Sequence, residues 1–187
     1  MIYITEMSFE DPARLTEWHK FYLENIANLQ SCPGFIASQR FEAVVDTLAP
    51  YTAVHEIESP AVFETDIYRT RGGRQSNGDW QAQMKNWHRN LYSGIDTTPR
   101  VPFDAFLVYF DAPSDVAKQE FPLPLASPVH WLELAGLDRT IAHRGVAILA
   151  KADEQIEFAR HDERIKVFKP ITDRIANGRP LSEFTQT

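Results

Sequence analysis

Cysteine is almost absent from this chain of 187 residues, in which Cys32 is the only one. A single cysteine cannot form a disulfide within its own chain, so nothing here points to an oxidising compartment. Cys32 stands just before Pro33-Gly34 and has no basic neighbour in the sequence. Such a neighbour is what usually lowers the pKa of a nucleophilic thiol. We therefore interpret Cys32 as a structural thiol.

Long apolar runs and clusters of basic residues are also missing. No apolar stretch approaches the roughly 18 residues of a membrane-spanning helix. Residues 1–7 lack the basic region and the apolar core of a signal peptide. The formal net charge is −7, and the densest basic stretch, residues 69–74, lies beside glycines in a loop-like segment. These features predict a cytoplasmic protein without a nucleic-acid or membrane partner.

Diagnostic catalytic and metal-binding motifs are absent as well. The histidines are dispersed, with no HxH, HxxxH or HExxH spacing, so we expect no metal site. Gly72-Gly73 matches neither a dinucleotide-binding nor a phosphate-binding loop, and no GxSxG elbow is present. No motif in the sequence therefore identifies a reaction.

What the chain does contain is apolar material, because 43% of its residues are hydrophobic and 12% are aromatic. That is enough to bury a core. In the first half, Asp11-Pro12 is typical of a helix start and Pro33-Gly34 of a helix end. Predicted strands cover residues 2–9, 35–45, 51–58 and 87–95, predicted helices cover 12–32 and 60–68, and 80–85 predicts a helical turn.

The same order of elements restarts after a proline-containing linker at residues 99–102. Residues 112–127 carry several prolines and predict at most one or two helical turns. The tail from Asn177 is rich in polar residues, glycine and proline, and we expect it to wrap or fray. Predicted strands cover residues 103–111, 130–136, 145–150 and 165–171, and a predicted helix covers 152–160.

This order predicts an α+β fold of two ferredoxin-like βαββαβ units in tandem, which together form an α+β barrel. The first unit would span residues 1–98, and the second would span residues 99–187 with the C-terminal tail. The alternative is one α+β domain with an irregular C-terminal extension.

Three stretches of the first half resemble the dimeric α+β barrel superfamily. They are Trp18 in the first helix, Pro33-Gly34-Phe35 at the start of the second strand, and residues 51–60 (YTAVHEIESP). Many members of that superfamily share a helix–PGF–strand segment and a similar strand-to-helix joint. The resemblance implies a barrel that holds a small molecule. One-unit members dimerise to close the barrel, and two units in one chain could close it internally. A further dimer is common in the superfamily, so the resemblance implies a homodimer.

The superfamily that the chain resembles includes cofactor-free monooxygenases, lactone isomerases, polyketide cyclases, aldoxime dehydratases and haem proteins of the chlorite-dismutase type. The fold alone cannot choose among them. Many small members carry a histidine near the end of the first helix, whereas residues 22–26 here read YLENI. This departure weakens any transfer of their catalytic group to this chain.

His55 and Glu56 are ionisable residues in the middle of an otherwise apolar strand. Alternation places them on opposite faces of the sheet, so they cannot act on one substrate atom together. Histidine suits acid/base work near neutral pH. His55 is therefore a candidate base, and the alternative is a core histidine bonded to a neighbouring group.

His88 is a second candidate base, next to Trp87 and near Tyr92. Aromatic side chains beside an imidazole suit a planar substrate, and the alternative is ordinary packing. Glu6 shares a strand face with Ile2 and Ile4, and Arg40 lies in the second strand. If both point into the barrel they could form a pair, or Arg40 could hold a substrate carboxylate or phenolate. The alternative is an edge-strand or solvent position for both.

We predict catalytic roles for His55, His88 and Arg40. His19 and His161 are interpreted as helix and surface residues, and His130 and His143 as haem ligands only if the chain binds haem. The predicted substrate-binding residues are Glu6, Tyr51, Trp87, Tyr92, Tyr109 and Trp131.

The function expected from these residues is acid/base catalysis on a small cyclic or aromatic carbonyl compound without a cofactor, of the isomerase, lyase, cyclase or monooxygenase type. One alternative is a haem-binding protein of the chlorite-dismutase type. Another is a non-catalytic module for small-molecule binding or assembly, since no clustered polar constellation is visible in the sequence.

Overall fold

The computed structural model describes residues 1–119 and 128–176. Its helices are α1 (Leu15–Gln30), α2 (Asp66–Arg71), α3 (Asp115–Gln119) and α4 (Asp153–Ala159), with 3-10 turns at Pro12–Arg14, Pro60–Glu64 and Arg74–Gln83. Its strands are β1 (Ile2–Phe9), β2 (Phe35–Ala43), β3 (Tyr51–Ile57), β4 (Met84–Ser93), β5 (Phe106–Ala112), β6 (His130–Leu137), β7 (His143–Leu149), β8 (Ile165–Pro170) and β9 (Ile175–Ala176). No helix in these two ranges is both long and apolar enough to cross a bilayer.

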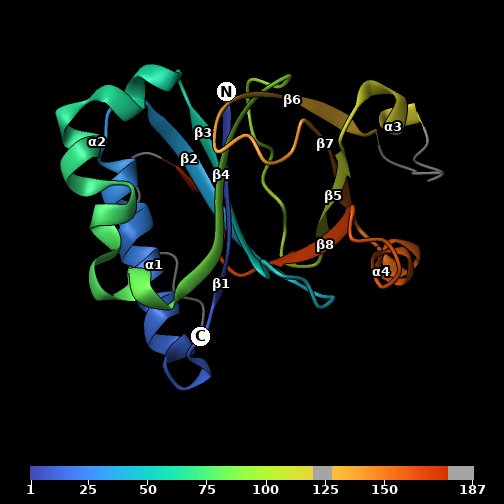
Figure 1. Cartoon of the computed structure of the whole chain (residues 1–187), viewed down its shortest axis with the longest axis horizontal. Coiled ribbons are helices and arrows are strands. Elements are labelled where there is room, and N and C mark those ends of the chain that lie inside the picture. The colour runs from blue at the N-terminus through green and yellow to red at the C-terminus, as the bar shows by residue number, and fades with distance from the viewer. Residues whose placement is uncertain (120–127, 177–187) are drawn as a thin grey trace.

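The strands form one sheet that closes on itself (Figure 1). The order around the ring is β3-β1-β4-β6-β7-β5-β8-β2, and β2 pairs with β3 to close it. Every pairing is antiparallel, and the short β9 adds to β2. Closure leaves the eight ring strands without an unpaired edge.

The predicted fold class is wrong. The structure is a closed eight-stranded antiparallel β-barrel in which sheet dominates, not an α+β barrel of two ferredoxin-like βαββαβ units. The ladders β4–β6 and β2–β8 run across the two halves of the chain, so the sheet is continuous. Helix α3 has five residues and α4 has seven, so helices make up little of the second half within residues 99–119 and 128–176. The division at residues 98 and 99 stays a prediction.

Helix α1 covers the outer face of β1, β2 and β3 (Figure 1). Its apolar residues recur every three to four positions, which places them on one side of a helix. That side is buried, with Trp18 and Ile26 at 0% exposure. Outward-pointing residues of the first half therefore pack under a helix, whereas inward-pointing residues line the barrel.

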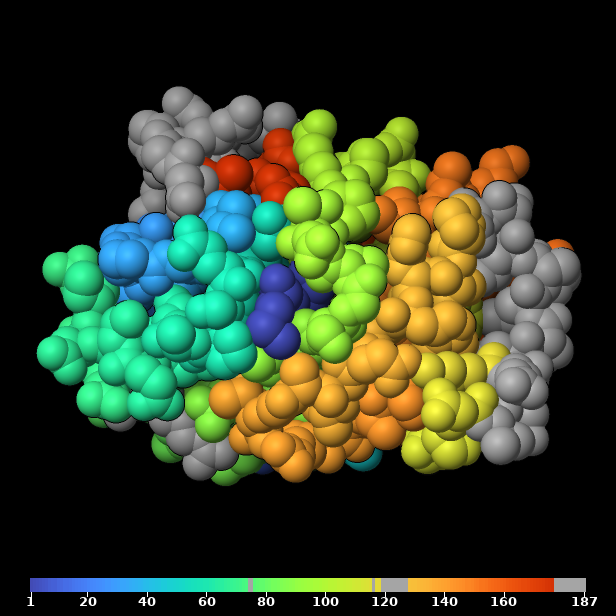
Figure 2. Space-filling view, turned by 90° about the horizontal axis from the view of Figure 1, so that it is seen from above, coloured from blue at the N-terminus to red at the C-terminus, as the bar shows by residue number. Residues whose placement is uncertain are grey.

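The barrel end at the N-terminus of β1 is covered by the segment that follows β4 and by residues near β9 (Figure 2). Gln39 fastens this cover from inside. Its Nε2 donates to the carbonyl oxygens of Val101 (2.7 Å) and Thr172 (3.1 Å), and its Oε1 accepts from the Val101 N–H at 3.0 Å. Beside it, Glu56 Oε2 accepts from the Thr98 N–H and from Arg174. Gln39 and Glu56 thus bond to the chain segments that cross this end of the barrel.

Replacing Gln39 with methionine keeps the side-chain length and removes all three of these hydrogen bonds. Buried groups left unpaired cost about 1–3 kcal/mol each, so we expect Gln39→Met to lower the free energy of unfolding by at least that amount. Urea denaturation measures it. The matched control is Gln83→Met, because Gln83 is only half-buried and contributes its backbone carbonyl, which the exchange retains, to a hydrogen bond with Glu10. An equal effect of both variants would contradict this account of the cover.

Candidate functional site

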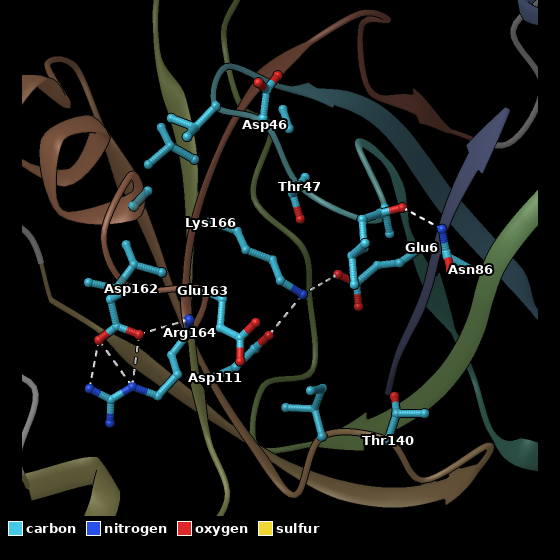
Figure 3. A pocket seen from close by; sticks show the side chains of 18 of the residues that line it. Glu6, Asp46, Thr47, Asn86, Asp111, Thr140, Asp162, Glu163, Arg164 and Lys166 are labelled. Carbon is cyan, nitrogen blue, oxygen red and sulfur yellow. Dashed lines mark hydrogen bonds and ion pairs between the residues drawn. The ribbon is translucent and has the colours of Figure 1, made fainter. Parts of the chain in front are cut away.

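The opposite end of the barrel is open, and we call it the mouth. A cavity of about 1200 Å³ occupies it. Its walls are the ends of β1, β4, β5 and β8 together with the loops at residues 45–49, 140–142 and 159–164, and on β8 they include both faces of the strand. Figure 3 shows these side chains converging on the cavity from several strands. Openings of β-barrels are common ligand sites because side chains from many strands meet there.

Four charged side chains form the base of this cavity, and we call them the charged floor: Glu6, Asp111, Arg144 and Lys166. Arg144 is fully buried beneath the cavity. Its guanidinium holds Asp111 in a bidentate pair, with Nε–Oδ1 at 2.6 Å and Nη2–Oδ2 at 2.8 Å. Its Nη1 donates to Glu6 Oε2 at 2.8 Å. Fork geometry of this kind fixes both carboxylates in direction as well as in distance.

Lys166 completes the charged floor and lines the cavity itself. Its Nζ lies 2.9 Å from Glu6 Oε1 and 3.1 Å from Asp111 Oδ2 (Figure 3). An ammonium group has three N–H donors. Two of them are used within the charged floor, and the side chain keeps 17% of its surface accessible. One donor therefore remains for an oxygen atom inside the cavity.

The electrostatics of the charged floor depend on this pairing. Burial alone would raise the pKa of Glu6, but Arg144 and Lys166 outweigh it and lower that pKa to about 2. Burial alone would lower the pKa of Arg144, whereas Asp111 and Glu6 raise it well above its usual value. With two carboxylates and two cations, the floor is neutral as a unit.

Two tyrosine rings lie on the barrel side of Arg144, away from the mouth. The centroid of the Tyr109 ring is 4.3 Å from Arg144 Cζ and that of Tyr92 is 5.9 Å away. Both rings are fully buried, and burial raises the pKa of each phenol, so they stay neutral. The Tyr109 hydroxyl lies 3.5 Å from Thr52 Oγ1. These rings form an aromatic layer that supports the guanidinium from below.

His88 lies at the rim of the mouth. It faces Glu6 across the β1–β4 ladder, so the two side chains share the inner face of the sheet. It is exposed and lines the cavity. On the same strand, Asn86 adopts a positive φ of 49° and donates through Nδ2 to the Leu48 carbonyl at 2.8 Å. This bond fastens the β2–β3 loop to the rim.

The structure places His55, the other candidate base, outside the barrel under α1. It is fully buried and lines neither cavity, with Nδ1 2.8 Å from Ser38 Oγ and Nε2 without a partner in the described residues. Gln30 Nε2 donates to the same Ser38 oxygen at 2.7 Å. Burial first, and then the charge of Arg40, lower the pKa of His55 to about 3.

Arg40 also points to the helix side, so it cannot pair with Glu6. Its guanidinium donates to the His19 carbonyl and approaches the Tyr22 ring at 4.1 Å. Burial lowers the pKa of Arg40 to about 10. Burial, followed by the charge of Arg40, lowers the pKa of His19 to about 4. Arg40 therefore stabilises the interface between α1 and the barrel, away from the mouth.

The predicted substrate-binding residues separate into three groups. Glu6 lines the mouth, and Tyr92 and Tyr109 form the aromatic layer beneath it. Tyr51 packs against α1, and Trp87 and Trp131 line neither cavity. Asp111, Arg144 and Lys166 are site residues that were not predicted from the sequence. Each is a charged residue within an apolar strand, which is the same signal that singled out Glu6.

A second charged cluster lies outside the mouth, where Asp115, Glu133 and His143 bring ligand atoms within 4.8 Å of one another. Lys118 Nζ already pairs with both carboxylates there, and His143 Nδ1 lies 2.5 Å from Glu133 Oε2. These contacts make it a salt-bridge cluster. His130 is exposed at the start of β6.

Fold and site together define an antiparallel β-barrel with an open polar mouth over a charged floor. A solved structure described as "Crystal structure study of anthrone oxidase-like protein" is similar to this chain, with a TM-score of 0.60 and 8% sequence identity over 95% of this chain and 93% of that one. At this identity the likeness shows the fold alone. No protein-family model matches the chain, and neither does any curated protein.

Removing the guanidinium of Arg144 should destabilise the folded state, because Lys166 would then be the one cation paired with the buried carboxylates of Glu6 and Asp111. We expect Arg144→Met to lower the free energy of unfolding by about 3–5 kcal/mol. The matched change Arg160→Met removes an exposed pair with Glu157 and should cost less than about 1 kcal/mol. Urea denaturation of both variants checks this, and a small loss in Arg144→Met would show that the floor tolerates uncompensated charge.

His55 should make the stability pH-dependent. Its folded-state pKa is about 3, below the ordinary value of 6.5, so the unfolded chain gains a proton first as the pH falls. Stability is lost from about pH 6.5 towards pH 3, with a slope from this group of about 1.4 kcal/mol per pH unit. His55→Asn keeps an acceptor for Ser38 and removes the titration. Stability measured from pH 7 to pH 4.5 should then fall less steeply than in the unchanged chain.

The range above pH 4.5 avoids the contribution of Glu6, whose stabilisation is lost only as the pH falls from about 4.5 through its lowered folded value. His19 also has a lowered pKa, so some slope remains in His55→Asn. The exposed His161→Asn is the control and should leave the slope unchanged. An unchanged slope in His55→Asn would disprove the assignment.

Proposed function

We propose that this chain is a cofactor-independent enzyme that acts at the mouth of its barrel on a small cyclic or aromatic carbonyl compound. The observation that carries the proposal is the charged floor, which presents the free donor of Lys166 at the base of a cavity of about 1200 Å³. The size suits a planar, multi-ring molecule. The acid/base partner is His88 on the rim.

Lys166 is suited to bind the carbonyl oxygen of such a substrate. Glu6 and Asp111 hold its Nζ in place before the substrate arrives. A fixed donor stabilises the negative charge that develops on the oxygen when a neighbouring carbon loses a proton. Arg144 acts only through the two carboxylates and is a positioning residue.

His88 is suited to remove that proton. Imidazole groups as a class exchange protons near neutral pH, which is the range in which a general base is effective. His88 shares the inner face of the sheet with Glu6, so its side chain and that of Lys166 approach one cavity from different strands. A substrate whose carbonyl oxygen is bound to Lys166 can then present an acidic C–H group to the rim.

The charged floor favours a substrate that is neutral overall. Its four charges cancel, and the remaining cavity wall sets Asp46, Asp162 and Glu163 against Arg160 and Arg164, which leaves a small acidic excess. An anion would approach acidic side chains without a compensating excess of cations. A neutral ketone avoids that cost and gains charge only in the transition state, where Lys166 stabilises it.

The structural neighbour is described as anthrone oxidase-like. We therefore propose oxidation by dioxygen as the specific reaction. After His88 removes a proton from a CH₂ group next to the conjugated system, the carbanion gives one electron to O₂. The carbon radical and superoxide combine into a peroxide anion, which takes the proton back from His88. The hydroperoxide then loses water to leave a ketone. The balance is R₂CH₂ + O₂ → R₂C=O + H₂O, with both electron pairs supplied by the substrate.

The proposal includes no resident cofactor. The haem alternative relied on His130 or His143, and neither lines the mouth, since His143 is held by Glu133. A Soret band in the purified protein would favour that alternative. Isomerase, lyase or cyclase chemistry would use the same two residues without oxygen. A homodimer is also proposed, and size-exclusion chromatography with light scattering tests it.

Lys166→Met should lower kcat/KM about 10²–10³-fold, the usual effect of removing one donor to a developing oxyanion. The probe is anthrone, and the assay follows oxygen uptake and formation of the quinone above the rate without protein. Lys169→Met is the matched control, because Lys169 is exposed on the same strand. Equal turnover in both variants would exclude Lys166 from the reaction.

His88→Ala should lower kcat/KM about 10²–10⁴-fold, as expected for loss of a general base. The control is His130→Ala, which removes an exposed histidine outside the mouth. If anthrone and related ketones bind to the unchanged protein without any turnover, the chain is a binding module instead of an enzyme.

A further inference from the structure

A second, smaller cavity lies inside the barrel, between the aromatic layer and the covered end. We call it the inner cavity. Its volume is about 30 Å³. One water molecule needs about 10–15 Å³, so the inner cavity has room for about two water-sized spheres. Its lining residues are mostly aliphatic and come from β1, β2, β3, β5, β6, β7 and the segment after β4.

The polar groups that border the inner cavity are already bonded elsewhere. The Gln39 amide is used by Val101 and Thr172. The Thr98 hydroxyl donates to Glu56, and the Tyr109 hydroxyl lies beside Thr52. A buried water needs two to four polar partners, and the N–H and O–H donors of these groups are all used, which leaves a water only acceptors. The inner cavity is therefore suited to an apolar occupant.

We infer that the inner cavity is a binding site for a small apolar gas, and that its occupant is dioxygen. An engineered apolar cavity in another protein stays dry and binds xenon or benzene. Benzene is too large for two water-sized spheres, whereas a diatomic molecule fits. Dispersion contacts with close-packed aliphatic walls favour such a molecule over empty space.

The inner cavity lies close to the mouth, where the proposed reaction would consume dioxygen. Tyr109 lines it and also packs against Arg144, whose partners form the charged floor. One layer of side chains therefore separates stored oxygen from the mouth. This use rests on the oxygen-dependent form of the proposed function, in which the carbanion reduces O₂. Binding itself depends only on the size and the walls of the cavity.

The test of binding uses dioxygen itself on protein labelled at isoleucine, leucine and valine methyl groups. Dissolved oxygen is paramagnetic, so it should enhance the relaxation of methyls that line the inner cavity, such as those of Ile4, Val54 and Ile148, beyond what their exposure explains. Xenon should reduce this enhancement by competition. If the relaxation enhancement of every methyl group simply followed its solvent exposure, the inference would be overturned.

Two variants fill the inner cavity by different amounts. Ile148→Phe should remove the localised enhancement, and Val54→Leu, which adds one methylene, should reduce it while disturbing the fold less. Ile67→Phe makes the same exchange at an exposed site and should leave the enhancement unchanged. Retention of full enhancement in a folded Val54→Leu would overturn the inference.

Turnover separates the inner cavity from the proposed function. With an active enzyme, Val54→Leu should raise the KM for oxygen several-fold and leave the KM for the organic substrate unchanged. An unchanged KM for oxygen would overturn the role of the cavity in supply. An inactive chain that still shows oxygen and xenon at these methyls would refute the proposed function while confirming the gas site.

Discussion

The pairing of Arg144 with Asp111 and Glu6 is the interaction on which the open end of this barrel depends. Side chains inside a small barrel normally fill it with apolar atoms, and here two carboxylates stand among them. They are stable there because a fully buried guanidinium and the ammonium of Lys166 neutralise them. The same carboxylates hold the ammonium group of Lys166 at the base of the cavity. The ion pairs that neutralise the buried charges therefore also form the candidate site.

The two ends of the barrel differ because polar side chains are used differently at each. At the covered end, Gln39 and Glu56 use their polar atoms on the chain segments that cross over the barrel. At the mouth, the charged floor and His88 face an open cavity. The aromatic layer of Tyr92 and Tyr109 separates the two environments, so a polar ligand and an apolar one can be held a short distance apart.

The helix side of the first half shows why ionisable residues in strands are ambiguous from sequence. His55 and Arg40 looked as reactive as Glu6, since each interrupts an apolar strand. The structure turns them towards α1, where His55 bonds to Ser38 and Arg40 contacts Tyr22. Alternation along a strand correctly separates His55 from Glu56, but it does not say which face points into the barrel. That choice depends on which face the helix covers.

Local patterns in the sequence determined most strand and helix positions, because alternation, helical spacing and breaking residues such as Pro33-Gly34 act over a few residues. They also identified Glu6 and His88, which line the mouth. Strand pairing between distant segments decided the rest. The ladders β4–β6 and β2–β8 close the barrel and overturn the predicted fold class. They also bring Glu6 to Arg144, 138 residues away in the sequence. A pattern that spans only a few residues cannot predict a contact over that separation.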